Sequence, residues 1–460
     1  MLVDWRTGVS HLTSWMLCLF FLASMDCMGQ NSETGGRAKA KEVANLAVEK
    51  LVEGSYEKVT QLFDSSLHSA LSAAGLKDAW IGATAGLGAF IEYHNVLTRP
   101  TPSGDSLSFA LHFEKGSLLL RAVVNDQDQL SGLWLADQEN VEWHLPSYAH
   151  PDRYEARHVV VGEKGPFPLE AELLVPLKSA KFPGVVFVHG SGPHDKDETI
   201  GGRKPFADLA VGLASRGIAV LRYDKRTKAY HKAVLENITV REEVIEDAVS
   251  AIALLRSCDG IDTARIFVLG HSFGGTLLPL IHDAEPKLAG LIMMAALATP
   301  LEDAILKQYE RLVAADGAGE ELQKQLEELR TQCCNVKSAT LAPDTPRDRL
   351  PLRVPASYWL SLRSYHPLAL VPHMATHFLV VQGGLDANVT QEDFDLWKRA
   401  LANNARATFL HYPSLNHLFM ADALTPGTDG GDREHVAEEV VEDVARWILS
   451  SLETAGRPGT

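Results

Sequence analysis

The run GHSFG at residues 270–274 constrains this chain more than any other segment. It follows a short apolar stretch and precedes a helix-compatible one, a setting in which Gly-x-Ser-x-Gly places its serine at a sharp strand-to-helix turn. The serine there is strained so that its hydroxyl is exposed, and the glycines leave room for neighbouring backbone. The pattern predicts Ser272 as a nucleophile, and a Gly-rich structural turn is the alternative.

A serine nucleophile needs a base to take its proton and a third group to orient that base. Where Gly-x-Ser-x-Gly marks the nucleophile, the acid and then the histidine follow it along the chain. Asp386 comes directly after the apolar run 377–382, and His417 comes soon after the next run, 407–412. We therefore predict Asp386 as the acid and His417 as the base.

Each of these two residues also has a plainer interpretation. Asp386 could be a turn or helix-capping residue, and His417 a half-buried loop histidine. His411 is a rival base, although it lies inside the predicted strand rather than beyond it.

Acyl transfer also requires hydrogen-bond donors aimed at the developing oxyanion. The N–H of Phe273, directly after the nucleophile, is the first expected donor. The second is expected from the Gly-rich loop HGSGP at residues 189–193, and the N–H of Ser191 is the best placed. In the same loop we expect His189 to brace the backbone rather than to take part in chemistry.

A metal site is not expected in this region. The polar residues of the loop are His194, Asp195 and Asp197, but no second cluster of ligands occurs elsewhere in the sequence. Solvation of the loop is therefore the simpler role for them. No P-loop or dinucleotide motif occurs in the sequence either.

Four segments together resemble the EstD-type carboxylesterases of the α/β-hydrolase superfamily, near its serine aminopeptidase and dienelactone hydrolase branches. They are HGSGP at 189–193, RYDKR at 222–226, GHSFGG at 270–275 and GLD at 384–386. The resemblance covers roughly residues 155–455 and implies cofactor-free hydrolysis of short-acyl carboxylic esters. One departure is Thr227, where a glycine is common in that branch, which puts the local turn in doubt but not the triad.

The order of elements independently predicts an α/β fold. Short apolar runs alternate with helical patterns, which favours a mostly parallel sheet covered on both faces. Ligands bind such sheets at the carboxyl ends of the strands, where Ser191, Ser272, Asp386 and His417 are all expected. The predicted strands are 156–161, 169–175, 184–188, 218–223, 264–269, 288–294, 377–382 and 407–412, and the helices 205–215, 241–256, 276–283, 391–401 and 435–452.

A long segment separates the sixth and seventh predicted strands. Residues 301–329 carry apolar side chains at helical spacing among many charges, which predicts one or two amphipathic helices. We expect a cap at about 301–357 that excludes water and shapes the acyl pocket. The YWL run at 358–360 either returns to the pocket rim or packs the cap onto the sheet.

The first 29 residues resemble an export signal, with an apolar stretch too short to span a bilayer. Export predicts a periplasmic, cell-envelope or extracellular location, without stable membrane insertion after the signal is removed. Cys27 leaves a lipoprotein open, and a cytoplasmic protein with a fortuitous apolar start is the remaining alternative.

A small α+β domain is predicted at residues 35–145. Helical patterns lie within 39–71, and strand-like runs follow at 107–113, 117–125 and 130–136. The segment is similar to an uncharacterised domain often fused in front of such hydrolases, with the cone-shaped nuclear transport factor fold. We find no catalytic set in it, and residues 146–154 are expected to link it to the hydrolase domain.

Composition limits the partners. A net charge of −16 argues against binding of nucleic acid or anionic membranes. Five cysteines, two of them in the signal region, form no disulfide framework. The resemblance to the carboxylesterases implies a small-molecule ester substrate, and homodimerisation stays open. The alternative functions are a serine aminopeptidase-like peptidase, a thioesterase, and a non-catalytic binding protein on a hydrolase fold.

Overall fold

The computed structural model describes residues 34–84, 87–101, 104–113, 116–137, 143–177, 181–200, 203–230, 238–315, 320–421 and 435–450. The predicted signal segment, residues 1–29, lies outside this part of the chain. The chain forms two compact units, Met25–Trp143 and His144–Thr460, which we describe separately. No helix among the described residues is long and apolar enough to cross a membrane.

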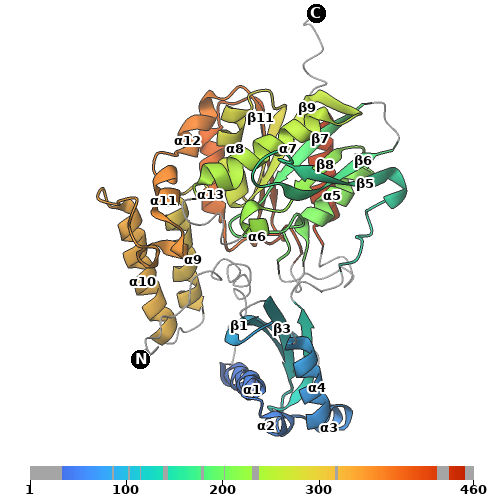
Figure 1. The fold of residues 1–460 in the computed structure, drawn as a ribbon, viewed down its shortest axis with the longest axis vertical. Helices are drawn as coiled ribbons and strands as arrows, with labels where there is room; N and C mark the ends of the chain where they lie inside the picture. The colour runs from blue at the N-terminus through green and yellow to red at the C-terminus, as the bar shows by residue number, and fades with distance from the viewer. Residues whose placement is uncertain are drawn as a thin grey trace, which may run out of the picture. The chain divides into compact units, whose positions relative to one another are not determined.

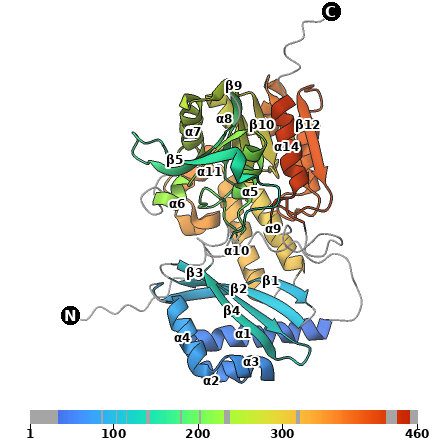
Figure 2. The same ribbon diagram turned by 90° about the vertical axis from the view of Figure 1, so that its right-hand side faces the viewer.

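The front unit packs helices against one antiparallel sheet with the strand order β1-β2-β3-β4 (Figure 2). Alternate residues of β2, from Leu107 to Phe113, join the apolar core beneath the helices. Two elements were not predicted, α4 and β1, because α4 contains Gly75 and Gly82 and β1 contains Pro100 and mixed polar residues. The elements are α1 Thr34–Val52, α2 Tyr56–Thr60, α3 Ser65–Ala70, α4 Ala73–Thr84, β1 Phe90–Thr101, β2 Gly104–Phe113, β3 Gly116–Val124 and β4 Leu130–Asp137.

The second unit is built on an eight-stranded sheet with the order β12-β11-β10-β9-β7-β8-β6-β5. The strands run parallel except where β6 pairs with β5 and with β8. The mostly parallel sheet predicted from the sequence is thus confirmed, with strand ends displaced by a few residues. The strands are β5 Tyr154–Val161, β6 Leu169–Pro176, β7 Phe182–Val188, β8 Ala219–Tyr223, β9 Ile261–His271, β10 Gly290–Met294, β11 His377–Gly383 and β12 Ala407–Tyr412.

Helices cover both faces of this sheet (Figures 1 and 2). Helices α5 and α14 pack together on one face, and α7 and α8 lie on the other. The predicted helix 241–256 begins with a π-helical turn, Arg241–Ile245, before continuing as α7. The bounds are α5 Pro205–Ser215, α6 Arg226–Tyr230, α7 Glu246–Ser257, α8 Phe273–Ala284, α12 Pro367–Leu370, α13 Gln391–Ala400 and α14 Glu438–Ser450.

The segment after the front unit is tied to the second unit. The hydroxyl of Ser215 accepts a hydrogen bond from the backbone N–H of His150 at 2.8 Å, and the guanidinium of Arg216 lies over the ring of Tyr148. Residues 146–154 therefore pack against the end of α5.

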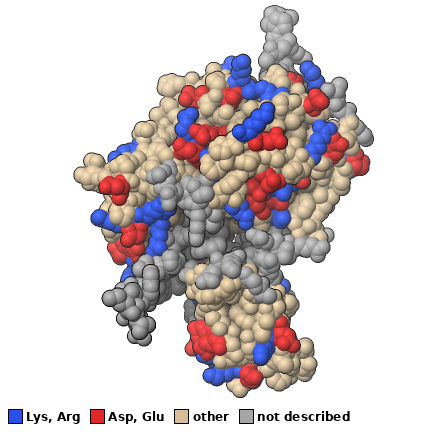
Figure 3. Space-filling view, in the orientation of Figure 1, with Lys and Arg blue, Asp and Glu red and all other residues tan. Residues whose placement is uncertain are grey.

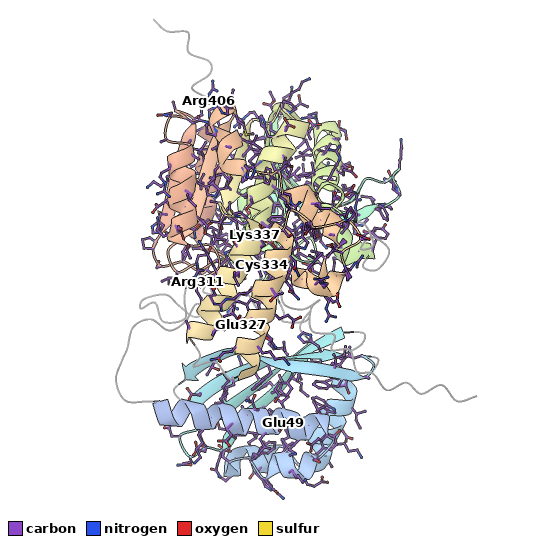
Figure 4. All side chains as sticks on the ribbon, turned by 90° about the vertical axis from the view of Figure 1, so that its left-hand side faces the viewer. Glu49, Arg311, Glu327, Cys334, Lys337 and Arg406 are labelled. Atoms are coloured by element: carbon purple, nitrogen blue, oxygen red, sulfur yellow. The ribbon has the colours of Figure 1, made fainter. Side chains whose placement is uncertain are left out.

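The cap consists of α9, Leu301–Ala315, and α10, Glu320–Lys337, joined by an Arg330–Glu310 ion pair at 3.0 Å. Figure 4 shows Arg311 on α9 and Lys337 on α10. A short helix, α11 (Ala356–Leu362), returns the chain to the sheet. It buries Tyr358 and Trp359, so these aromatic residues pack the cap onto the fold.

Charged side chains of both signs alternate over the visible face of the second unit (Figure 3). Ion pairs in the second unit, such as Arg256–Glu285 at 3.0 Å, join neighbouring elements. The net negative charge of the chain is therefore not gathered into one acidic surface on this face.

Candidate active site

The predicted nucleophile lies at the sharp turn between β9 and α8. Ser272 has φ 52° and ψ −123°, a conformation that a non-glycine residue adopts only under strain. Its backbone N–H donates to the carbonyl of Met294 at 2.8 Å, which holds the turn against β10. A Cβ on Gly274 would lie 2.4 Å from the carbonyl oxygens of Val188 and His189, so only glycine allows α8 to approach the end of β7 so closely.

Asp386 lies in the loop that follows β11, and its side chain is almost fully buried. One carboxylate oxygen accepts hydrogen bonds from the N–H groups of Asn388 at 2.8 Å and Val389 at 2.9 Å. The other oxygen accepts from Nδ1 of His417 at 2.6 Å and from the side-chain amide of Gln382 at 3.2 Å. The residue binds the backbone of its own turn and the histidine at once, so its place in the turn is compatible with the acid role predicted for it.

His417 lies in a tight turn after β12, in which the side chain of Asn416 accepts hydrogen bonds from the N–H groups of Leu418 and Met420. Because the carboxylate of Asp386 accepts from Nδ1, the neutral imidazole of His417 carries its proton on Nδ1, and the residue lines the pocket. His411 lies on β12 itself with its ring against Phe394, away from the pocket-lining residues.

One pocket brings together Ser272, His417 and Ser191. Phe273 is buried, and its N–H belongs to the first turn of α8, where backbone N–H groups lack intrahelical acceptors. A Cβ on Gly190 would lie 3.2 Å from the Cβ of Ser272, so the Gly-rich loop directly contacts the serine turn. The other lining residues are Gly190, His194, Glu198, His271, Leu297, Leu301, Ala304, Ile305, Gln308 and Asn388.

The cap supplies one wall of this pocket. Leu301, Ala304 and Ile305 of α9 face it, and all three are buried. The side chains of Gln308 and Arg311 donate to the carbonyls of Asn388 and Ala387 in the loop that carries the aspartate. The position of α9 is therefore fixed by the same loop that orients His417.

Among the remaining polar residues of the Gly-rich loop, His194 and Asp195 bind its backbone. His194 donates through Nε2 to the carbonyl of Ser191 at 2.6 Å, and Asp195 accepts from the N–H and hydroxyl of Thr199. Burial lowers the pKa of His189 to about 3, and its ring packs beside Phe206 without lining the pocket. In the described part of the chain, no three side chains are grouped as metal ligands.

Sequence reasoning missed a second histidine–carboxylate pair directly behind the serine. Nδ1 of His271 lies 2.9 Å from Oε2 of Glu198, although poorly aligned for a hydrogen bond, so charge attraction holds the pair. The Nε2–H of His271 donates to the carbonyl of His417 at 3.0 Å, and Glu198 accepts from the N–H of Gly190 at 2.7 Å. The only local signal was the position of His271 beside Ser272.

Both members of this pair have displaced pKa values. Burial opposes charging of each group, but the attraction between them dominates. The pKa of Glu198 falls to about 2, and the pKa of His271 rises above its ordinary 6.5. Native His271 therefore holds its proton above pH 6.5, where the unfolded chain has lost it. The pair stabilises the fold fully between about pH 4.5 and 6.5, and its contribution falls as pH rises further.

Glu198→Gln removes this charge while keeping the side-chain shape. We expect the stability difference between wild type and variant to shrink between pH 6 and pH 9, because only the wild type loses an ion pair there. Each tenfold difference in proton affinity corresponds to about 1.4 kcal/mol. Urea unfolding of both proteins across this pH range measures the difference, and a constant difference would show that the pair carries no charge.

Comparison with known proteins agrees with this architecture. The model of a family described as "Alpha/beta hydrolase family" matches residues 185–425, and one described as "Protein of unknown function (DUF3887)" matches residues 44–133. Esterase EstD of Thermotoga maritima is 31% identical over 410 residues, which are 88% of this chain and 94% of that protein.

Among solved structures, two esterases are similar to this chain at low TM-scores. Est1E from Butyrivibrio proteoclasticus has a TM-score of 0.42 and 16% identity, covering 64% of this chain and 99% of its own. The bacterial brefeldin A esterase has a TM-score of 0.41 and 18% identity, and the match covers 69% of this chain and 82% of that protein. Neither likeness bears on activity. The family match and the long alignment with Esterase EstD show that this chain belongs to the α/β hydrolase family and is an ester hydrolase.

Proposed function

We propose that this protein hydrolyses short-acyl carboxylic esters through an acyl-enzyme formed on Ser272. The observation that carries the proposal is the 2.6 Å hydrogen bond between His417 and the buried carboxylate of Asp386, with the histidine lining the same pocket as Ser272. A histidine held in this tautomer is suited to take a proton from a serine hydroxyl.

The reaction then follows in two steps. The Ser272 oxygen attacks the acyl carbon while Nε2 of His417 takes the hydroxyl proton, and the N–H groups of Ser191 and Phe273 stabilise the oxyanion. His417 next gives its proton to the departing alcohol, which leaves an acyl group on the serine. Water, activated by the same histidine, attacks this acyl group and regenerates the enzyme.

The pocket walls favour an uncharged substrate. Glu198 is the only carboxylate among the described pocket-lining residues, and it already binds His271 and Gly190. A free carboxylate to hold a peptide amino terminus is therefore absent from that lining, as is a Lys or Arg that could hold the phosphates of an acyl-CoA. Ester hydrolysis is thus preferred over the peptidase and thioesterase alternatives.

Asp386→Asn tests the assignment of the acid. The asparagine keeps the size of the side chain but favours the wrong imidazole tautomer, so kcat for p-nitrophenyl butyrate is expected to fall by roughly 10³–10⁴-fold. Ser272→Ala serves as the reference for background turnover. Near-normal turnover by Asp386→Asn would mean that another carboxylate orients His417.

An aminoacyl p-nitroanilide, assayed beside the ester with the wild-type enzyme, separates the two enzyme classes. Ester turnover above anilide turnover is expected. The reverse order would assign the protein to the peptidase branch, and turnover of neither would favour the binding-protein alternative.

The α9 wall is expected to limit the acyl chain. Ile305→Ala opens the pocket beside Ser272, so the kcat/KM ratio for octanoate over butyrate should rise at least about tenfold. Leu329→Ala is the matched control, since Leu329 is buried in α10 of the same cap but does not line the pocket. An unchanged ratio in Ile305→Ala would place the acyl group elsewhere.

Export belongs to the same proposal and rests on the pattern of residues 1–29. Amino-terminal sequencing of the protein isolated from its native cells is expected to begin near Gln30. A chain that still starts at residue 1 would contradict export by a cleaved signal.

A further inference from the structure

The Gly-rich loop after β7 is held by three buried side chains, Lys225, Glu198 and His194. The carbonyl of Gly190 accepts a hydrogen bond from Nζ of Lys225 at 2.9 Å, and its N–H donates to Glu198 at 2.7 Å. The carbonyl of Ser191 accepts from His194 at 2.6 Å. Three backbone groups of Gly190 and Ser191 are thus fixed by three different side chains.

The contact from Lys225 has a consequence for the next N–H group. The peptide between Gly190 and Ser191 is planar and trans, so its carbonyl and its N–H point in opposite directions. Lys225 binds the carbonyl and is not among the pocket-lining residues, whereas Ser191 lines the pocket. Holding the carbonyl on the lysine side therefore turns the Ser191 N–H toward the pocket side.

This orientation needs a constraint, because glycine permits large backbone rotations at little cost. A flip of the peptide would change ψ of Gly190 and φ of Ser191, and would direct a carbonyl instead of an N–H into the site. An ammonium on the carbonyl oxygen opposes the flip, and it also polarises the peptide so that its N–H becomes a stronger donor.

Lys225 is itself rigidly placed. It is 2% exposed, and its ammonium lies 3.3 Å from the carboxylate of Glu243. Glu243 belongs to the π-helical turn before α7 and also accepts from the hydroxyls of Tyr358 at 2.8 Å and Thr227 at 3.2 Å. The backbone N–H of Lys225 donates to the carbonyl of His194, which ties the lysine to the Gly-rich loop a second time.

We propose that Lys225 is a positioning residue that sets the orientation of the Gly190–Ser191 peptide and thereby supplies the second oxyanion donor. This inference rests on the proposed ester hydrolysis at Ser272. It assigns a chemical task to the Asp-Lys-Arg segment after β8, which lies outside the pocket. We therefore expect that removing Lys225 weakens stabilisation of the transition state and leaves substrate affinity almost unchanged, because a donor aimed at the oxyanion contributes little to ground-state binding.

The experiment compares Lys225→Met with the wild type on p-nitrophenyl butyrate and on a trifluoromethyl ketone inhibitor, whose hemiketal adduct with serine carries an oxyanion. We expect kcat to fall about 10²–10³-fold while KM changes less than about threefold, with a parallel loss of inhibitor affinity. The double variant Lys225→Met/Glu243→Gln, which leaves no unpaired buried carboxylate, is expected to show the same loss and guards against misfolding.

Tyr358→Phe is the matched control, since it removes a hydrogen bond to Glu243 on the side away from Gly190 and should keep kcat within about threefold. The inference is overturned if the folded double variant keeps wild-type kcat, or if kcat falls without loss of inhibitor affinity. Failure of the proposed function is a separate outcome, because the Ser272→Ala variant would then retain turnover regardless of the result for the Lys225 variants.

Discussion

The close approach of backbone at the serine turn is the constraint on which the rest of the site depends. Ser272 can occupy its left-handed conformation only because Gly274 lets α8 press against the carbonyls at the end of β7. That contact brings the loop after β7 within van der Waals reach of the serine. The contact between α8 and the end of β7 therefore positions both the proposed nucleophile and the loop proposed to stabilise its oxyanion.

Buried polar and charged side chains hold the loops that follow the strands. Two loops at the pocket are held by polar side chains from other segments. Asp386 and His271 bind His417 in the loop after β12, and Lys225 binds Gly190 in the loop after β7. Burying a polar or charged group costs free energy unless it has hydrogen-bond or charged partners. The geometry of these contacts is therefore specified more tightly than that of apolar contacts. The site is preorganised by these interactions and not by the cap alone. Side chains of α9 also donate hydrogen bonds to the loop that carries Asp386.

The sequence predicted the strands of the second unit, and the positions of Ser272, Asp386 and His417 after them, because each follows a short apolar run that ends in a turn signal. It did not reveal Glu198 or Lys225, since a charged residue in a polar loop carries no local mark of burial. Their partners, His271 and Gly190, are distant in the chain. Thr227 departs from the expected glycine, yet the helix α6 accommodates it, and its hydroxyl binds Glu243.

The central claim is that Ser272 carries the acyl group during turnover. The most direct test is to mix the enzyme rapidly with p-nitrophenyl butyrate and to quench with acid within the burst of nitrophenol release. Peptide mapping by mass spectrometry then locates the acyl group. The account predicts one butyryl group on the peptide that contains Ser272, and none on the Ser272→Ala variant. A burst without an adduct on that peptide, or a butyryl group on another residue, would contradict it.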